Sequence, residues 1–224
     1  MVSPAMIWKP VKAPVAETTE GTYIRLEKLV PARHSEDLWD VLVGPGADPL
    51  FWDFLPYGPF NDRELFDIWL DSYAISNDPL GFCVVDKETG KAEGVLSLMS
   101  IVPAHGRIEI GHVAFGAPMQ RTPKGTEAIY LLAQQVFNAG YRRVEWKCDN
   151  RNERSRRAAA RFGFTPEGVF RQHMVVKNHN RDTAWFSLLD SQWPAVKEGF
   201  EAWLAPENFK AGKQVNTLEA LRGL

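Results

Sequence analysis

Two clusters of basic residues are the parts of this sequence whose residue types and spacing suggest chemistry. The first lies in Met119–Ala128 (MQRTPKGTEA), where Arg121 and Lys124 stand between a predicted strand and a predicted helix. Such a junction offers free backbone N–H groups and the positive end of the helix dipole, which together bind phosphate. The second is Cys148–Phe164 (CDNRNERSRRAAARFGF), which has five arginines within residues 151–161. We expect a phosphorylated ligand to lie between the two clusters and to meet the N-termini of two helices.

Each cluster also has a simpler interpretation. The first contains no G-x-x-x-x-G-K-[ST] loop and no G-x-G-x-x-G turn, and an ordinary helix with Thr122 as N-cap and Pro123 at its first position would have the same sequence. The second is also compatible with a solvated helix face or a nucleic-acid patch. The chain has a net charge of −2 and a pI of about 6.2, so it lacks the overall positive field that holds nucleic acid. A nucleic-acid partner is therefore not expected.

Length and composition favour a single soluble domain. The 224 residues, 45% of them hydrophobic, suffice for a full core. The two cysteines, Cys83 and Cys148, make no disulfide framework, and no His/Cys group has the spacing of a zinc site. The proline-rich start lacks the apolar region of a signal peptide, and no apolar run approaches the roughly 18 residues of a membrane helix. These features predict a cytoplasmic protein without a metal or a membrane span.

The periodicity of apolar residues outlines the elements that must position the two clusters. Alternation with period two predicts a strand at 22–29. Further strands are predicted at 81–85, 92–101, 107–115, which is rich in β-forming residues, 143–148, 169–176 and 183–189. Helical spacing predicts helices at 35–43, 61–76, 126–139, 152–161 and 193–204. This order indicates an α/β fold with a mixed, mostly antiparallel central sheet of about seven strands flanked by helices.

Several local details follow from the same patterns. Ser35 is placed to cap the first helix. One face of the second helix is expected to carry Leu65, Ile68, Trp69 and Ser72. The stretch Asp48–Phe60 (DPLFWDFLPYGPF) has neither period and is expected to be a packed loop, of the kind that often walls a site. The polar tail after Pro206 is expected to be loosely held.

At these residues the sequence resembles the GNAT superfamily of acyl-CoA-dependent N-acyltransferases, and in particular its ribosomal-protein RimJ/RimL-like branch. The family's pyrophosphate loop, Q/R-x-x-G-x-G/A followed by Thr-Glu-Ala, is matched by Gln120, Gly125 and Thr126–Ala128. Pro123 replaces the first glycine and removes one N–H donor, which other amides or nearby basic side chains would have to offset. A longer match to C-D-x-x-N-x-x-S and G-F-x-x-E-G is formed by Cys148, Asp149, Asn152, Ser155, Gly163, Phe164, Glu167 and Gly168.

The resemblance implies acetyl-CoA, or a related acyl-CoA, as the donor and a primary amine as the acceptor, with transfer by direct attack. It implies that the strand 107–115 splays from its neighbour, so that backbone N–H groups around Val113 and Phe115 hold the pantetheine and polarise the thioester carbonyl. Asn152 matches the family position that hydrogen-bonds the pantetheine, and its alternative is a plain N-cap. The loop residues assigned to the donor are Gln120, Arg121, Thr122, Lys124, Gly125 and Thr126.

The same resemblance assigns the proton transfers. Glu109 would accept the amine proton, and its alternative is a strand residue that faces solvent or pairs with an arginine. Ser155 would give a proton to the leaving thiolate, and its alternative is a hydroxyl bonded back to its own helix. His112 is a second candidate for the base and, with Asp182, is placed in the acceptor site, although a turn-forming Asp182 is equally compatible with the sequence. Cys148 is expected to be a small buried thiol.

The match covers roughly residues 22–193. It divides the chain into a proline-rich N-terminal extension at 1–21, an acetyltransferase domain at 22–193, and a C-terminal helix and polar tail at 194–224. A GNAT-like domain that binds CoA or a partner without transferring anything is the alternative function, and Pro123 speaks for it. The acceptor would be a protein N-terminus or a small-molecule amine, and a homodimer is compatible with the sequence.

Overall fold

The fold is built around one eight-stranded sheet. The computed structural model describes residues 7–223, and its strands have the order β1-β2-β3-β4-β5-β6-β8-β7. The strands are β1 (Thr19–Glu20), β2 (Ile24–Lys28), β3 (Leu80–Asp86), β4 (Ala92–Val102), β5 (Arg107–Phe115), β6 (Arg143–Asp149), β7 (Thr165–Val176) and β8 (His179–Leu189). Every neighbouring pair is antiparallel except β5 and β6. The expected mixed, mostly antiparallel sheet is confirmed, with the two-residue β1 as an additional strand.

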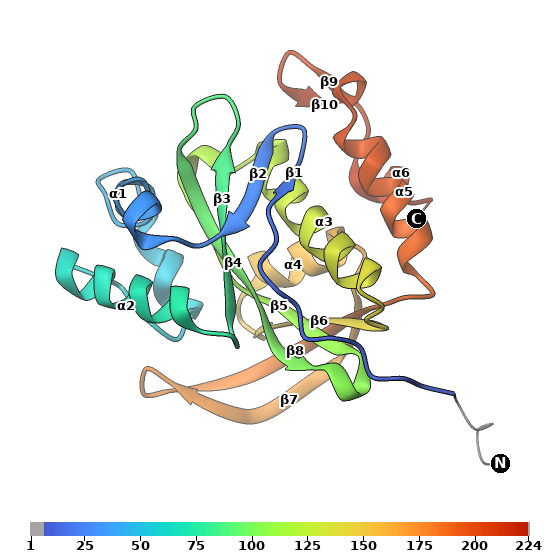
Figure 1. Ribbon diagram of the computed structural model, residues 1–224, viewed down its shortest axis with the longest axis horizontal. Helices are drawn as coiled ribbons and strands as arrows, with labels where there is room; N and C mark the ends of the chain where they lie inside the picture. The colour runs from blue at the N-terminus through green and yellow to red at the C-terminus, as the bar shows by residue number, and fades with distance from the viewer. Residues whose placement is uncertain (1–6, 224) are drawn as a thin grey trace.

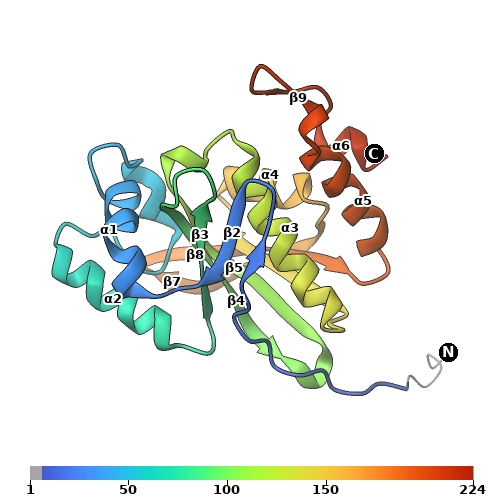
Figure 2. The ribbon, with the colours of Figure 1, turned by 45° about the horizontal axis from the view of Figure 1, so that its top comes forward.

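Helices cover both faces of this sheet (Figures 1 and 2). The α-helices are α1 (Pro31–Leu42), α2 (Arg63–Ile75), α3 (Pro123–Asn138), α4 (Glu153–Arg161), α5 (Trp193–Leu204) and α6 (Leu218–Leu221). The 3₁₀ segments are η1 (Pro49–Phe54), η2 (Pro103–His105), η3 (Ala117–Met119) and η4 (Pro206–Asn208). Two buried clusters form the core, one between the sheet and α3, α4 and α5, the other between the opposite face and α1, η1 and α2.

Two details of the first helices differ from the sequence-based expectation. Helix α1 begins at Pro31, whose fixed φ suits the first helical position, so Ser35 lies inside the helix and does not cap it. Helix α2 is capped by Asp62, as expected, but it buries Phe66, Leu70 and Tyr73. Leu65 and Ile68 are each 58% exposed, so the expected face of α2 is wrong by about one residue.

The polar tail is docked rather than loosely held, which corrects the expectation for the residues after Pro206. A small hairpin, β9 (Phe209–Lys210) and β10 (Lys213–Gln214), leads into α6, where Leu218 is completely buried. The side chain of Asn208 donates to the carbonyl oxygens of Trp203 (3.1 Å) and Asn216 (3.2 Å) and accepts from Asn216 N (2.9 Å). These bonds fix the tail against α5.

Glu127, from the Thr-Glu-Ala run, ties helix α3 to the start of the sheet. Its carboxylate accepts the backbone N–H groups of Thr22 (2.6 Å), Tyr23 (2.8 Å) and Ile24 (2.8 Å). The side chain is almost completely buried, and Gly21 leaves room for it. Glu127 is therefore a structural anchor that holds α3, and with it the loop before α3, in place.

Candidate active site

The site begins where β5 and β6 separate. These parallel strands pair only through Arg107–Glu109 and Arg143–Glu145. Beyond that point β5 continues to Phe115 against β4, and β6 continues to Asp149 against β8. Between residues 110 and 115, the edge of β5 that faces β6 has no strand partner among residues 7–223, and its backbone groups are available to a ligand. The expected splay of the strand 107–115 is thus present.

A bulge in β5 shapes this opening. Val95 and Ser97 of β4 pair with Ala114 and Gly111, so two residues, His112 and Val113, lie opposite one. His112 takes a left-handed φ of 50°, and the Ser97 hydroxyl donates to the Gly111 carbonyl (3.1 Å). The bulge bends the strand at the residues assigned to the pantetheine.

The loop assigned to the pyrophosphate follows the C-terminal end of β5 and leads into α3. Thr122 is the N-cap: its hydroxyl oxygen accepts from Lys124 N (3.3 Å), and Pro123 takes the first helical position. Arg121 is exposed with a left-handed φ of 59°, and Gln120 is exposed beside it. The ordinary capped helix is therefore present, and the first turn of such a helix still offers N–H groups to an anion.

Gly125 keeps the first turn of α3 close to β5. A Cβ atom at this position would lie 3.3 Å from the Phe115 ring. The half-buried Val113 and Phe115 also pack against the core cluster under α3. The residues assigned to the pantetheine and to the pyrophosphate are therefore adjacent, as the sequence-based assignment requires.

Two of the assigned loop side chains are engaged within the protein. The Lys124 ammonium forms ion pairs with Asp86 and Glu93 (2.8 Å to Glu93 Oε2). Burial opposes its charge, but the two carboxylates raise the pKa of Lys124 above its usual range. The buried Thr126 hydroxyl accepts from Arg161 Nη1 (2.9 Å). Lys124 therefore does not offset the N–H group that Pro123 lacks, and Arg121 is the basic loop side chain that points to solvent.

Asn152 and Ser155 lie at the start of α4, where β6 ends. The Asn152 side-chain oxygen accepts from Ser155 N (3.0 Å), so the N-cap interpretation holds. Trp146 Nε1 donates to Ser155 Oγ (2.9 Å). Because the indole supplies this proton, the hydroxyl proton of Ser155 is not used in the contact with Trp146. A side-chain hydrogen bond also joins Ser155 to the Cys148 thiol. Ser155 is thus oriented by Trp146, a contact across the strand–helix junction that the sequence pattern did not indicate.

Glu109 is buried at the base of the opening, which excludes the solvent-facing alternative. Its side chain is 6% exposed and pairs with Lys147 Nζ (2.7 Å to Oε2) rather than with an arginine. Ser100 Oγ donates to the same oxygen (3.0 Å). Burial raises the pKa of Glu109 above its usual range, and Lys147 and Ser100 oppose that increase. A carboxylate with a raised pKa in such a place is suited to accept a proton near neutral pH.

His112 lies among aromatic rings next to Glu109. Its ring centroid is 5.3 Å from that of Tyr57 and 5.9 Å from that of Tyr73. Burial and the nearby Arg181 lower the pKa of His112 to about 4, so its ring is neutral at physiological pH. Its buried Nδ1 has no hydrogen-bond partner among the described residues. His112 therefore offers a vacant polar atom to a ligand on the α2 side of the sheet.

Comparison with known proteins decides the family. Residues 26–165 match the model of the acetyltransferase (GNAT) domain. The crystal structure of a GCN5-related N-acetyltransferase from Brucella melitensis is 49% identical in sequence, covers 97% of this chain and 99% of that chain, and superposes with a TM-score of 0.94. The chain belongs to the GNAT acetyltransferase family.

Two further solved structures are similar to this GNAT acetyltransferase. A probable GNAT-family acetyltransferase from Chromobacterium violaceum is 41% identical, with 87% of this chain and 97% of that chain covered and a TM-score of 0.80. The microcin C7 self-immunity acetyltransferase MccE, solved with acetyl-CoA and AMP, is 25% identical, with 75% and 93% covered and a TM-score of 0.66. No curated protein matches the chain.

Acetyl-CoA, the donor that GNAT acetyltransferases use, fits the residues present. The β5 edge past Glu109 has no strand partner in the described part of the chain. The first turn of α3 lies beside the end of this edge, with Gly125 next to Phe115. The unpartnered buried Nδ1 of His112 and Nε1 of Trp185 also mark this region as one that a ligand completes.

Arg151, just before α4, and the arginines Arg156 and Arg161 within α4 form contacts inside the protein. Arg151 binds Asp149 through both side-chain oxygens (3.0 and 2.8 Å), and Arg156 donates to the Asn150 carbonyl (3.4 Å). Arg161, at the C-terminal end of α4, is the arginine that reaches the first turn of α3. The C-terminal end of α4 therefore lies against the first turn of α3, and the meeting of a ligand with two helix N-termini stays a prediction.

The stretch Asp48–Phe60 walls the site, as expected for this loop, and part of it is the 3₁₀ helix η1. Asp48 forms an ion pair with Arg154 of α4 (2.9 Å), and the Trp52 carbonyl accepts from Lys177 of the β7–β8 turn (2.8 Å). Tyr57 contacts His112. The loop thus reaches α4, the hairpin and the β5 bulge.

Asp182 lies on β8 and supports the neighbouring β7. Its Oδ1 accepts from Gln172 N (2.7 Å) and from Asn180 Nδ2 (3.0 Å). Gln172 has a left-handed φ of 49° in an irregular part of β7. Asp182 therefore stabilises the β7–β8 hairpin, a role close to the turn-forming alternative. It lies on the side of the site that this hairpin forms.

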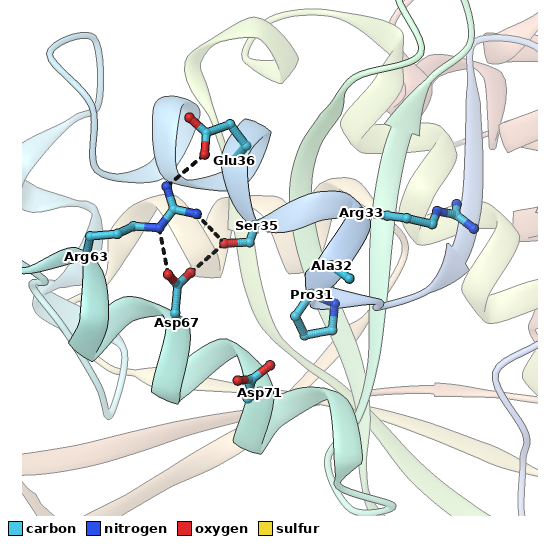
Figure 3. Close-up of a pocket in the computed structure, with 8 residues that line it drawn as sticks. All are labelled: Pro31, Ala32, Arg33, Ser35, Glu36, Arg63, Asp67 and Asp71. Atoms are coloured by element: carbon cyan, nitrogen blue, oxygen red, sulfur yellow. Dashed lines mark hydrogen bonds and ion pairs between the residues drawn. The ribbon is translucent and has the colours of Figure 1, made fainter.

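A separate hollow of about 430 Å³ lies between α1 and α2 (Figure 3). Arg63 lines it and donates to Glu36 (3.0 Å), Asp67 (2.8 Å) and Ser35 Oγ (2.6 Å). Its charges are largely paired internally, and it holds none of the predicted site residues. Within residues 7–223 there is no cluster of three or more metal-ligating side chains, and no helix there is both long and apolar enough to span a bilayer.

Proposed function

We propose that this acetyltransferase transfers the acetyl group of acetyl-CoA to a primary amine by direct attack. The observation that carries the proposal is the buried Glu109 carboxylate at the point where β5 and β6 separate. Acyl transfer to an amine needs a neutral amine, a proton acceptor, a polarised carbonyl and a proton for the leaving sulfur. Each of these needs has a candidate group around this one opening.

Backbone and side-chain groups at and beyond the C-terminal ends of β5 and β6 would hold acetyl-CoA. The N–H groups around Val113 and Phe115 would bind the pantetheine, and the first turn of α3, with Arg121 beside it, would bind the pyrophosphate. Asn152, at the end of β6, would add a hydrogen bond through its amide. Bound in this way, the donor supplies an activated thioester carbonyl, which the β5 amides polarise.

Proton transfers would run through two groups of the chain. Glu109 would accept the proton that the attacking amine loses, and Ser155 would hold a proton for the leaving sulfur. Cys148 takes no part, because direct transfer needs no covalent intermediate and burial raises the pKa of its thiol.

The acceptor is proposed to be a protein N-terminus or a small-molecule amine. The RimJ/RimL-like pattern of residues 148–168 favours the first. The MccE structure, solved with acetyl-CoA and AMP, is the more distant analogy for a small-molecule acceptor. Tyr57, His112 and Trp185 would line the acceptor side.

We also propose a cytoplasmic location and a homodimer. Both cysteines are free thiols, which suits a reducing compartment. The edge strand β7 exposes Val169, Phe170, Met174 and Val175, and apolar residues on an open strand edge favour pairing with a second copy. Light scattering of the purified chain tests the homodimer.

The transfer is tested by incubating the protein with acetyl-CoA and a panel of amines while free thiol is measured. Release of CoA that depends on the amine, with an acetylated product of matching mass, supports the proposal. Thermal stabilisation by CoA without any turnover would instead establish the non-catalytic CoA-binding alternative. The panel should contain peptides with different N-terminal residues as well as small amines.

A further inference from the structure

Lys147 is a half-buried cation beside Glu109. It lies on β6, two residues beyond the last residue that pairs with β5, and its side chain is 14% exposed. Its Nζ atom is 2.7 Å from Glu109 Oε2 and 4.4 Å from the centroid of the Trp185 ring, and it donates to Ser100 Oγ (3.4 Å). A carboxylate, a hydroxyl and an aromatic face therefore fix the position of this ammonium group.

The charges around the pair leave Lys147 with one principal partner. Glu145 also lies near Lys147, at 3.8 Å, but Arg143 (2.9 Å) and Arg107 (3.5 Å) already balance its charge. Among the described residues, Lys147 is the one cation within 4.0 Å of the Glu109 carboxylate. A buried carboxylate without such a partner takes up a proton.

The two oxygens of Glu109 have different surroundings. Lys147 and Ser100 both donate to Oε2. No described residue donates to Oε1, which lies 3.4 Å from the position that a Cβ atom at Gly111 would occupy. Oε1 therefore lies toward the β5 bulge, where the strands open, and Gly111 adds no side chain above it.

We propose that Lys147 is a positioning residue for acyl transfer, which holds Glu109 by Oε2 and keeps its carboxylate charged so that Oε1 accepts the proton of the acceptor amine. The inference rests on the proposed function. In the step itself, a bond forms between the amine nitrogen and the acyl carbon, and the carbon–sulfur bond breaks. The amine proton passes to Glu109 Oε1, and the Ser155 hydroxyl proton goes to the sulfur. Ser155 takes up a proton from solvent, and Glu109 releases the amine proton to solvent, so the protons balance.

The groups that face Glu109 set the pH dependence. They are Lys147 and Glu145 on β6 and Ser100 on β4, with the neutral His112 farther along β5. Burial raises the pKa of Glu109, Lys147 opposes this, and Glu145 adds to it. Because a base works only in its ionised form, loss of the Lys147 charge would move the acidic limb of the rate profile to higher pH.

The test compares Lys147→Met with Lys147→Arg over a range of pH. In Lys147→Met, we expect the midpoint of the acidic limb in the pH profile of kcat/KM to move to higher pH by about one unit or more. This is the shift expected when an opposite charge at this distance is lost. The KM for acetyl-CoA should stay within about twofold, because Lys147 holds Glu109 and is not among the residues assigned to the donor. Lys147→Arg, which keeps the charge, should restore the limb. Lys91→Met removes an exposed lysine and serves as the matched control.

A second measurement does not depend on turnover. Titration of the Glu109 carboxyl carbon by ¹³C NMR, assigned with Glu109→Gln, should show the same upward shift of the pKa in Lys147→Met. An unchanged pKa and an unchanged acidic limb would overturn the role of Lys147. Absence of transfer to every amine would overturn the proposed function instead, and the NMR titration would still decide whether Lys147 keeps Glu109 charged.

Discussion

At the scale of single residues, the site is defined by which polar atoms already have a hydrogen-bond partner within the protein. Both protein donors that reach Glu109 bind Oε2, and the Trp146 indole binds the oxygen of Ser155 while leaving its proton. His112 keeps a buried nitrogen without a partner in the described part of the chain. Oε1 of Glu109 and Nδ1 of His112 are thus polar side-chain atoms on β5 that have no donor or acceptor in the described part of the chain.

His112 should make stability depend on acidic pH. Its pKa is lowered to about 4 in the folded protein, against about 6.5 when unfolded, so between these values only the unfolded state binds the proton. Stability from this residue is therefore lost as pH falls from 6.5 toward 4. Relative to the native protein, His112→Asn should gain about 3 kcal/mol in free energy of unfolding on going from pH 7 to pH 4.

Urea unfolding of His112→Asn at a series of pH values provides the measurement. The exposed His179, replaced by asparagine, is the matched control and should show no such gain. A constant difference between the native protein and His112→Asn across the range would show that His112 is protonated as easily in the fold as in the unfolded chain.

At the scale of elements, the sequence pattern located the strands well, although β3 is buried along its whole length and is a continuous run without alternation. It placed the wrong face of α2 in the core, because Leu65 and Ile68 form one apolar stripe and Phe66 and Leu70 form another. Helical periodicity fits both stripes, and only packing against α1 and the sheet selects between them. The same limit applies to Ser35, whose hydroxyl meets Asp67 on another helix.

The site shows a similar division. Glu109, Asn152 and Ser155 were found by resemblance to a family pattern. The partners that orient them, Lys147 and Trp146, lie on β6, and their contacts depend on the register of neighbouring elements. Strand register and helix docking are long-range properties, which a local pattern does not contain.

Helix α3 should depend on Glu127 for its place on the sheet. Glu127→Ala would leave the backbone N–H groups of Thr22, Tyr23 and Ile24 without their acceptor. At about 1 to 3 kcal/mol for each buried unsatisfied group, with partial relief by water, we expect a loss of about 3 kcal/mol in free energy of unfolding. Urea denaturation measures the loss. Glu198→Ala, on an exposed part of α5, should cost less than about 0.5 kcal/mol, and an equal cost for both variants would contradict the anchoring role.

At the scale of the whole molecule, both ends of the described chain belong to the folded unit. The β1 strand joins the sheet, and α6 packs on α5 with Leu218 completely buried. Arg222 of the tail donates to the Ala160 carbonyl (3.1 Å) in α4, the helix that begins with Asn152. The tail therefore supports the same layer that carries the site.

Leu218→Ala should accordingly destabilise the entire fold. Removal of a buried leucine side chain costs about 2 to 5 kcal/mol, and the lower end is expected in a terminal helix that can relax. A single cooperative thermal transition at lower temperature, followed by circular dichroism, is the expected result. The exposed Val215→Ala is the control, and a native-like melting temperature for Leu218→Ala would show that the tail is not part of the core.

The central claim is that acetyl transfer takes place in the opening between β5 and β6, with Asn152 and Ser155 at its edge. The most direct test is the turnover number for CoA release by the Asn152→Ala/Ser155→Ala double variant, measured with an amine that the native protein acetylates. We expect a decrease of at least about tenfold, the scale of losing one positioned donor. Because Asn152 caps α4 and Ser155 accepts from Trp146, the melting temperature should also fall, by the amount that loss of a cap of about 1 kcal/mol implies. Native turnover in the double variant would contradict the placement of the site.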